Sequence, residues 1–232
     1  MDSVLVTGAS RGLGLAIAQK LAGDGFHVIA AARKAGAATE GVTPVAFDLA
    51  DVPAIPDFVR GLRQRFGPLY GLVNNAGLGT EGMLATMADP DIEALIRLNT
   101  LSPIMLTKYV TRGMLAEGRG RVINISSIVA SHGFNALSVY SATKASLLGF
   151  TRSLAREVGR VGVTVNAIAP GFIDTEMTRG LGEKDRDRIV ARSALRRLAE
   201  PQDIAAMASY LMSDAARNIT GTVMTVDAGG TA

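Results

Sequence analysis

Tyr140 and Lys144 lie four residues apart at the start of a helix-forming run. This spacing places both side chains on one face of a helix, about one turn apart. An ammonium group close to a phenol favours the phenolate, so the pair predicts a proton donor with a lowered pKa. Ser127 ends an apolar run upstream, where its hydroxyl can donate a hydrogen bond to a carbonyl oxygen. The three residues together predict carbonyl reduction or alcohol oxidation.

Each of these residues also has a plainer interpretation. A tyrosine and a lysine at this spacing are usually surface neighbours on a helix. The chemical interpretation therefore depends on whether the rest of the chain supplies a cofactor site and a scaffold that would bring the three side chains together.

A glycine-rich turn near the start of the chain predicts a phosphate site. Residues 3–6 read as a buried strand, residues 15–22 as a helix, and three glycines lie between them in the spacing GxxxGxG. Glycines let the backbone approach a pyrophosphate closely, and the helix N-terminus supplies free N–H groups and a positive dipole end. Tight turns also use glycines, but this position favours dinucleotide binding. The predicted cofactor contacts in this turn are Gly8, Ser10, Arg11, Gly12, Leu13 and Gly14.

The end of the predicted second strand, residues 26–31, indicates which dinucleotide binds. NAD sites tend to carry an acidic residue there, and NADP sites favour a nearby arginine. Here the strand is followed by Arg33 and Lys34, with no acidic residue. Arg11 and Arg33 are placed to bracket a 2′-phosphate, although both also read as solvated surface arginines. We therefore predict a preference for NADP(H), with NAD(H) as the alternative.

Polar and small residues follow the next two predicted strands, residues 43–47 and 72–73. Asp48 and Leu49 follow the first; the Asp48 carboxylate is predicted either to accept a hydrogen bond from the adenine amino group or to cap a turn. Asn74-Asn75-Ala76-Gly77 follows the second. Small residues there let the backbone approach a ribose, and Asn side chains tie neighbouring strands together. A plain Asn-Gly type of turn is the alternative.

Asn99 lies inside a long predicted helix, residues 90–113, among leucines and isoleucines. Asparagine is unfavourable in mid-helix and costly to bury without partners. A kink or a bound water would satisfy it; otherwise it reads as a surface residue. Beside Ser127, Tyr140 and Lys144 it becomes a candidate water-holding residue.

The second half of the chain continues the alternation of strands and helices. Predicted strands cover residues 120–125, 161–168 and 221–226, and Pro170 and Gly171 follow the middle one. Residues 177–199 are the most charged stretch. We predict a substrate lid over residues 176–200; a solvated amphipathic surface is the other interpretation.

Seven strands alternating with helices predict an α/β fold. The expected architecture is a Rossmann-like, doubly wound, seven-stranded parallel sheet with helices on both faces, forming one dinucleotide-binding and catalytic domain over residues 1–232. Ligands bind such sheets at the carboxyl ends of the strands. The glycine turn, Asp48, Asn75, Ser127 and Gly171 all fall at such ends, and this convergence supports the chemistry predicted for Tyr140 and Lys144.

The composition narrows the function classes. The chain is 48% hydrophobic, which suits a large buried core, and it has no cysteine, which excludes disulfides and thiolate metal sites. We expect no metal. The net charge of +3 comes without any block of basic residues, so nucleic acid is not an expected partner. With no apolar leader and no apolar run of membrane-spanning length, we expect a cytoplasmic protein without a membrane partner.

Taken together, the motifs resemble the short-chain dehydrogenase/reductase family over nearly the whole chain. Within it the chain looks most like the 3-oxoacyl-[acyl-carrier-protein] reductases of bacterial fatty-acid synthesis, with similar segments at residues 153–158, 163–175 and 219–230. The motifs stand in the family's order and spacing: Thr7-Gly8-x-x-x-Gly12-x-Gly14, Asn74-Asn75-Ala76-Gly77, Asn99, Ser127, Tyr140-x-x-x-Lys144 and Pro170-Gly171. The sequence departs from the family in a short loop between Ile29 and Asp48. Arg119 and Arg160 lie only near the family's carrier-docking arginines.

The resemblance implies roles for these residues. Tyr140 would be the acid in reduction, Ser127 would bind the carbonyl oxygen, and Lys144 would hold the nicotinamide ribose. Asn99 would position a water. The remaining cofactor contacts it implies are Leu49, Asn75, Ala76, Gly77, Pro170, Gly171, Ile173 and Thr175, the last two at the carboxamide.

The resemblance also implies a substrate and an assembly. The expected reaction is NADPH-dependent reduction of a ketone, best matched by the 3-oxo group of an acyl thioester, with acyl carrier protein as a partner and a homotetramer as the assembly. Other carbonyl reductases or secondary-alcohol dehydrogenases, acting on coenzyme A thioesters, sugars or foreign ketones, are the alternative. A non-catalytic NADP-binding protein is a third class.

Overall fold

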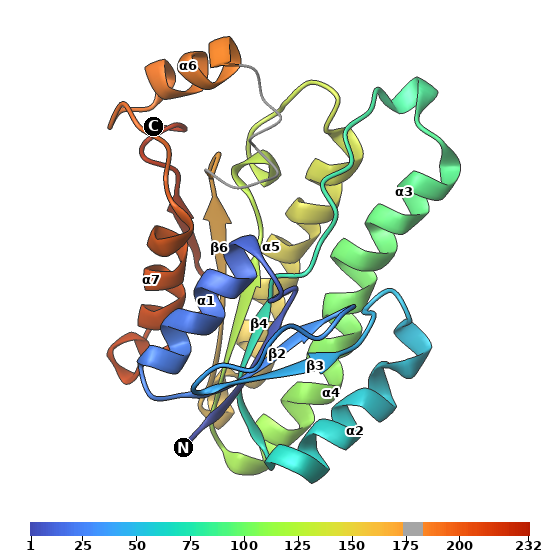
Figure 1. Cartoon of the computed structure of the whole chain (residues 1–232), viewed down its shortest axis with the longest axis vertical. Coiled ribbons are helices and arrows are strands. Elements are labelled where there is room, and N and C mark those ends of the chain that lie inside the picture. The colour runs from blue at the N-terminus through green and yellow to red at the C-terminus, as the bar shows by residue number, and fades with distance from the viewer. Residues whose placement is uncertain (174–182) are drawn as a thin grey trace.

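The computed structural model of the chain describes residues 1–173 and 183–232 (Figure 1). Within these residues a single parallel sheet has the strand order β3-β2-β1-β4-β5-β6-β7. The order runs outward in both directions from β1, as in a doubly wound sheet, which confirms the predicted fold class. The strands are β1 Ser3–Thr7, β2 His27–Ala32, β3 Val42–Ala46, β4 Leu69–Asn74, β5 Gly120–Ile125, β6 Val163–Pro170 and β7 Val223–Val226.

Helices cover both faces of the sheet. The described helices are α1 Gly12–Gly23, α2 Ile55–Phe66, α3 Asp89–Ile96, α4 Ser102–Glu117, α5 Ser138–Val158, α6 Glu183–Arg192 and α7 Pro201–Met212. Short 3-10 turns lie at Val52–Ala54, Leu84–Thr86, Ile128–Ala130, Gly159–Val161 and Asp214–Ala216. The helices α1 and α7 pack together on one face, and α2, α4 and α5 cover the other (Figure 1). In the part of the chain that the structure describes, no helix is long and apolar enough to cross a membrane.

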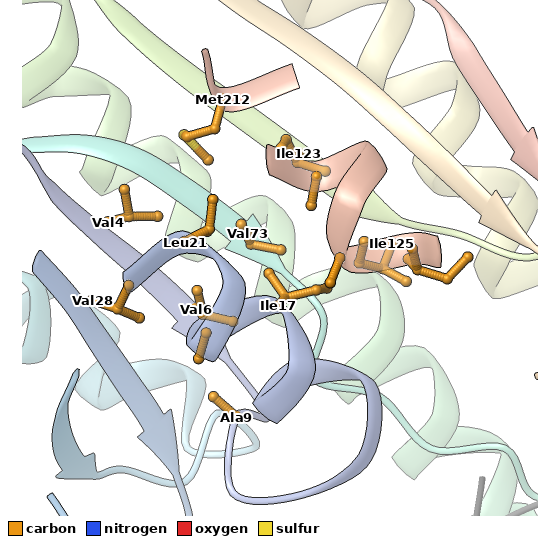
Figure 2. Packing of buried hydrophobic residues seen from close by; sticks show 14 of the residues in the cluster. Val4, Val6, Ala9, Ile17, Leu21, Val28, Val73, Ile123, Ile125 and Met212 are labelled. Carbon is orange, nitrogen blue, oxygen red and sulfur yellow. The ribbon is translucent and has the colours of Figure 1, made fainter. Parts of the chain in front are cut away.

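Two apolar cores result, one on each face of the sheet. Figure 2 shows the first, where Ile17 and Leu21 of α1 pack over Val4, Val6 and Val28 of the strands. The inner strands are buried along their whole length, which explains why they are largely apolar in sequence. The rigid sheet fixes the positions of the residues that follow its strands.

The fourth strand begins earlier than the sequence predicted. It starts at Leu69, because the preceding turn is completed at Gly67, whose φ of +77° ends α2 within one residue. Gly71 therefore lies inside the strand. A Cβ there would be 2.6 Å from the Met212 sulfur and 2.9 Å from Val4, so glycine permits close packing of α7 on the sheet.

The long helix predicted over residues 90–113 is interrupted at Asn99. A π-helical turn, Arg97–Leu101, separates α3 from α4. Pro103 has no N–H to give to the Asn99 carbonyl, so the α-helical ladder breaks at this point. The Ser102 hydroxyl caps the turn through hydrogen bonds to the carbonyls of Arg97 (2.8 Å) and Leu49 (2.6 Å). Of the alternatives left open for Asn99, the structure shows an interruption of the helix with the residue buried.

The charged stretch predicted as a lid is only partly described. Residues 176–182 lie outside the described residues, as does Thr175, and α6 occupies residues 183–192. The stretch is anchored at its end, where Ala199 pairs with Ile173 in an isolated parallel bridge. The lid function stays a prediction.

Candidate active site

A cavity of about 1010 Å³ lies at the carboxyl ends of the strands. Every residue predicted for the site lines it, except Asn99, which lies behind its wall, and Thr175, which is not described. The sheet order explains this convergence, because the turns after β1, β2, β4, β5 and β6 all open on one edge. The lining residues extend from the glycine turn after β1 to Tyr140 on α5.

The glycine turn gives the backbone the close approach that a pyrophosphate needs. Gly8 has a φ of +66°, and α1 begins at Gly12 with its N-terminus at the cavity. A Cβ on Gly14 would lie 2.3 Å from the Gly8 carbonyl oxygen and 2.5 Å from Nδ2 of Asn75. Only glycine fits there, and the free N–H groups of the helix face the cavity as an anion site.

Asn74, the last residue of β4, and Asn75, which follows it, tie neighbouring strands together, as predicted. Nδ2 of Asn74 donates to Oδ1 of Asn124 on β5 (2.8 Å) and to the Thr107 hydroxyl (2.9 Å). Nδ2 of Asn75 donates to the Thr7 carbonyl at the end of β1 (2.9 Å). These bonds hold the backbone of residues 76 and 77 at the cavity wall.

Asp48 caps a turn, which is one of the two roles predicted for it from the sequence. Its Oδ1 accepts a hydrogen bond from the Ala50 N–H at 2.9 Å, and the residue also lines the cavity. Capping the turn is therefore confirmed, and adenine recognition by the same carboxylate stays a prediction. Arg11 and Arg33 are exposed side chains at the same end of the cavity.

Ser127 and Tyr140 meet at the other end of the cavity. Ser127 follows β5, Tyr140 lies in the first turn of α5, and both side chains line the cavity. Burial raises the pKa of the Tyr140 phenol, and the nearby Ser127 hydroxyl acts in the opposite direction. A protonated phenol beside a second hydroxyl is a proton donor poised for a carbonyl oxygen.

Lys144 is buried beneath the phenol. Its Nζ donates to the Ile125 carbonyl oxygen at 2.9 Å and lies 5.8 Å from the centroid of the Tyr140 ring. Loss of hydration lowers the pKa of Lys144 to about 8. The lowered pKa predicted for Tyr140 is wrong, because burial of the phenol raises its pKa by more than the nearby Ser127 hydroxyl lowers it.

Asn99 holds the wall of the cavity through its side chain. Its Oδ1 accepts from the Leu78 N–H (2.8 Å), and its Nδ2 donates to the Leu78 carbonyl (2.8 Å) and the Thr143 hydroxyl (3.1 Å). The side chain thus links the π-helical turn, the segment after β4 and α5. The water-holding role stays a prediction, and these partners are protein groups that satisfy the buried amide.

Sequence reasoning missed the apolar residues near Tyr140. Phe172 follows β6 and meets Phe134 edge to face, with ring centroids 5.9 Å apart. The isolated apolar residues of loops gave no periodic signal that could have marked them. The apolar lining residues at this end are Leu78, Ile128, Val129, Leu137 and Phe172.

The two arginines considered for carrier docking lie at the opposite end of the sheet. Arg119 immediately precedes β5 and forms an ion pair with Asp2, which precedes β1. Arg160 lies in the turn that precedes β6. Within one chain both are therefore at the amino ends of the strands, away from the cavity. Among the residues that the structure describes, no cluster of His, Asp and Glu could hold a metal ion.

A dinucleotide-sized cavity that ends at a serine and a tyrosine suits hydride and proton transfer between a nicotinamide and a carbonyl. The class so defined is that of NAD(P)-dependent oxidoreductases acting on C=O and CH–OH groups. The chain belongs to the short-chain dehydrogenase/reductase family: a family model described as "Enoyl-(Acyl carrier protein) reductase" matches residues 8–231.

Relatives and solved structures agree with this membership. The chain is 40% identical over 235 residues to the 3-oxoacyl-[acyl-carrier-protein] reductase FabG of Escherichia coli, which covers 97% of this chain and 95% of that one. It is 37% identical over 227 residues to the reductase MabA of Mycobacterium tuberculosis, covering 98% and 92%. A structure of ElxO with NADP bound superposes with a TM-score of 0.91 at 28% identity, covering 99% and 98%.

Proposed function

We propose that this protein is an NADPH-dependent reductase of ketones, best suited to the 3-oxo group of an acyl thioester. The observation that carries the proposal is the Ser127–Tyr140 hydroxyl pair at the end of a dinucleotide-sized cavity. The 3-oxoacyl reductases among its relatives support the substrate class.

The chain's own groups supply orientation and the proton. When bound, the nicotinamide supplies the hydride. Ser127 and Tyr140 donate hydrogen bonds to the carbonyl oxygen, where negative charge develops, and Tyr140 delivers its proton there. The raised pKa of Tyr140 keeps the phenol protonated at neutral pH, as reduction requires. Lys144 beneath it compensates the charge that remains on the phenolate oxygen.

The apolar end of the cavity favours an acyl group over a sugar. Val129, Leu137 and Phe172 line it beyond the hydroxyl pair. Burying such surface against an acyl chain is favourable, whereas sugar hydroxyls would lose their hydration without partners. We also propose that the assembly is a homotetramer in the cytoplasm and that acyl carrier protein delivers the substrate.

The proposal is tested by measuring NADPH and NADH oxidation side by side with acetoacetyl thioesters of coenzyme A and acyl carrier protein. A panel of simple ketones, ketosugars and a crotonyl thioester runs in parallel. We expect NADPH consumption to be fastest with an acetoacetyl thioester. Faster reduction of simple ketones would indicate another kind of carbonyl reductase. Reduction of the crotonyl double bond would indicate an enoyl reductase. No NADPH consumption across the panel would favour a non-catalytic binding protein.

Cofactor preference is predicted to depend on Arg33. Its guanidinium lines the cavity beyond β2, where the 2′-phosphate of NADPH is expected. Arg33→Ala should raise KM for NADPH about 10- to 100-fold, the size of a lost charge-assisted hydrogen bond, and leave KM for NADH nearly unchanged. Lys34→Ala is the matched control, because it removes the same charge one residue outside the cavity lining. An equal effect of both substitutions on NADPH would assign the preference to long-range charge instead.

A further inference from the structure

The chain ends in a tight turn beside the part of the cavity that follows β6. The Gly230 N–H donates to the Asp227 carbonyl at 3.0 Å, and the two residues between them, Ala228 and Gly229, have φ angles of +55° and +76°. Alanine rarely adopts this left-handed conformation. Such strain persists only where surrounding contacts fix it, and it is often found beside functional sites.

The carboxylate of Asp227 fixes the turn from within. It accepts hydrogen bonds from the N–H groups of Gly229 and Thr231, both at 2.9 Å, and from the Thr231 hydroxyl at 2.6 Å. Ser193, which is buried, donates its hydroxyl to the carbonyl of the strained Ala228 at 2.8 Å. These hydrogen bonds hold the turn in one conformation.

On one side this turn supports the wall of the cavity. The Gly171 N–H donates to the Val226 carbonyl at 3.0 Å, and a Cβ on Gly171 would lie 2.5 Å from the Cβ of Asp227. Gly171 lines the cavity, so Asp227 is directly behind the segment expected to meet the nicotinamide. Asp227 and Thr231 do not line the cavity themselves.

On its other side the turn holds the residues that follow α6. The N–H groups of Ala194 and Leu195 donate to the carbonyls of Gly229 (3.2 Å) and Ala228 (3.0 Å). Figure 1 shows the C-terminus close to α6. The turn thus joins the end of the charged stretch to the cavity wall at Gly171.

We propose that Asp227, Thr231 and Ser193 are positioning residues that hold the Gly171 wall where the nicotinamide half of the cofactor binds. The inference rests on the proposed function, because it requires NADPH in this cavity. It predicts that weakening the turn lowers affinity for the nicotinamide half of the cofactor and not for the adenine half.

The test compares Thr231→Val with Thr231→Ser. Valine keeps the shape of threonine and removes the hydroxyl bond to Asp227, whereas serine retains that hydroxyl. Kd is measured for NADPH by its fluorescence and for 2′-phospho-ADP-ribose, which lacks nicotinamide, by calorimetry. We expect Thr231→Val to raise the Kd of NADPH about tenfold, to leave that of the fragment unchanged, and to be rescued by serine. Asp227→Asn should have the same pattern with a larger effect.

The outcomes separate this inference from the proposed function. NADPH binding that Thr231→Val leaves unchanged would overturn the inference alone. Equal weakening of NADPH and the fragment, with a lower melting temperature, would show a general structural role and also overturn it. Failure of the unmodified protein to bind NADPH would overturn the proposed function and the inference with it. Because Thr231→Val removes one hydrogen bond and Asp227 accepts three, the Thr231 variants keep the test available if Asp227→Asn does not fold.

Discussion

Replacing Tyr140 with phenylalanine is expected to lower kcat for ketone reduction by about 10³- to 10⁴-fold, the contribution of a well-placed general acid. The substitution removes one oxygen atom and leaves the ring in place. The phenol lies near Ser127 at the end of the cavity, and its raised pKa keeps it protonated at neutral pH. Without it, no proton is positioned for the alkoxide that forms on hydride transfer.

The loss should appear in turnover and not in cofactor binding. Kd for NADPH, measured by fluorescence, should stay within about twofold, because the cofactor's phosphates bind at the other end of the cavity. Tyr210→Phe on α7 is the matched control, since Tyr210 is exposed and does not line the cavity. A Tyr140→Phe protein that retained most of its turnover would contradict the assignment of the acid.

The sequence predicted best the parts of the fold that depend on the types of residue within one segment. Parallel strands buried on both faces are largely apolar, so β1, β5 and β6 could be found from residue type alone. The alternation of strands and helices with right-handed crossovers predicted a doubly wound parallel sheet, and the structure gives its strand order. The start of β4 was missed because Gly71 reads as part of a turn, and only the sulfur of Met212 shows why glycine is needed inside that strand.

The site was predictable to the extent that its residues follow strands. The topology brings the carboxyl ends of the strands to one edge of the sheet. The candidate cofactor residues that follow strands could therefore be assigned to one site from the sequence. The partners of Asn99 could not, because Leu78 lies in an irregular loop with no periodic pattern. The pKa of Tyr140 was predicted in the wrong direction for a related reason: spacing indicates which charge is near, whereas desolvation depends on the complete packing around the phenol.

Lys144→Met is expected to make the protein more stable and nearly inactive. Burial lowers the pKa of Lys144 from 10.5 to about 8, which is a cost of about 3 kcal/mol for keeping the ammonium charged in the folded state. Methionine has a similar length and carries no charge. Methionine cannot make the hydrogen bond to the Ile125 carbonyl, which contributes about 1 kcal/mol. We therefore expect a net gain of about 1–3 kcal/mol in the free energy of unfolding at pH 7.

The pH dependence follows from the direction of this shift. Between pH 8 and 10.5 the unfolded chain keeps the Lys144 proton and the folded protein releases it. Lys144 therefore makes the free energy of unfolding rise with pH across this window, and its full cost applies below pH 8. The advantage of Lys144→Met, measured by urea unfolding, should be largest below pH 8 and disappear before pH 10.5, where the lost hydrogen bond to Ile125 outweighs the remaining cost of the charge.

The same substitution separates stability from catalysis. Removing the cation beneath the phenolate oxygen should lower kcat by about 10²- to 10³-fold, as expected for a lost electrostatic contact to developing charge. Lys108→Met on α4 is the control, because Lys108 is exposed and does not line the cavity. If Lys144→Met instead destabilised the protein at pH 7, the Ile125 hydrogen bond would outweigh desolvation. The buried lysine would then stabilise this fold, instead of lowering its stability for the sake of catalysis.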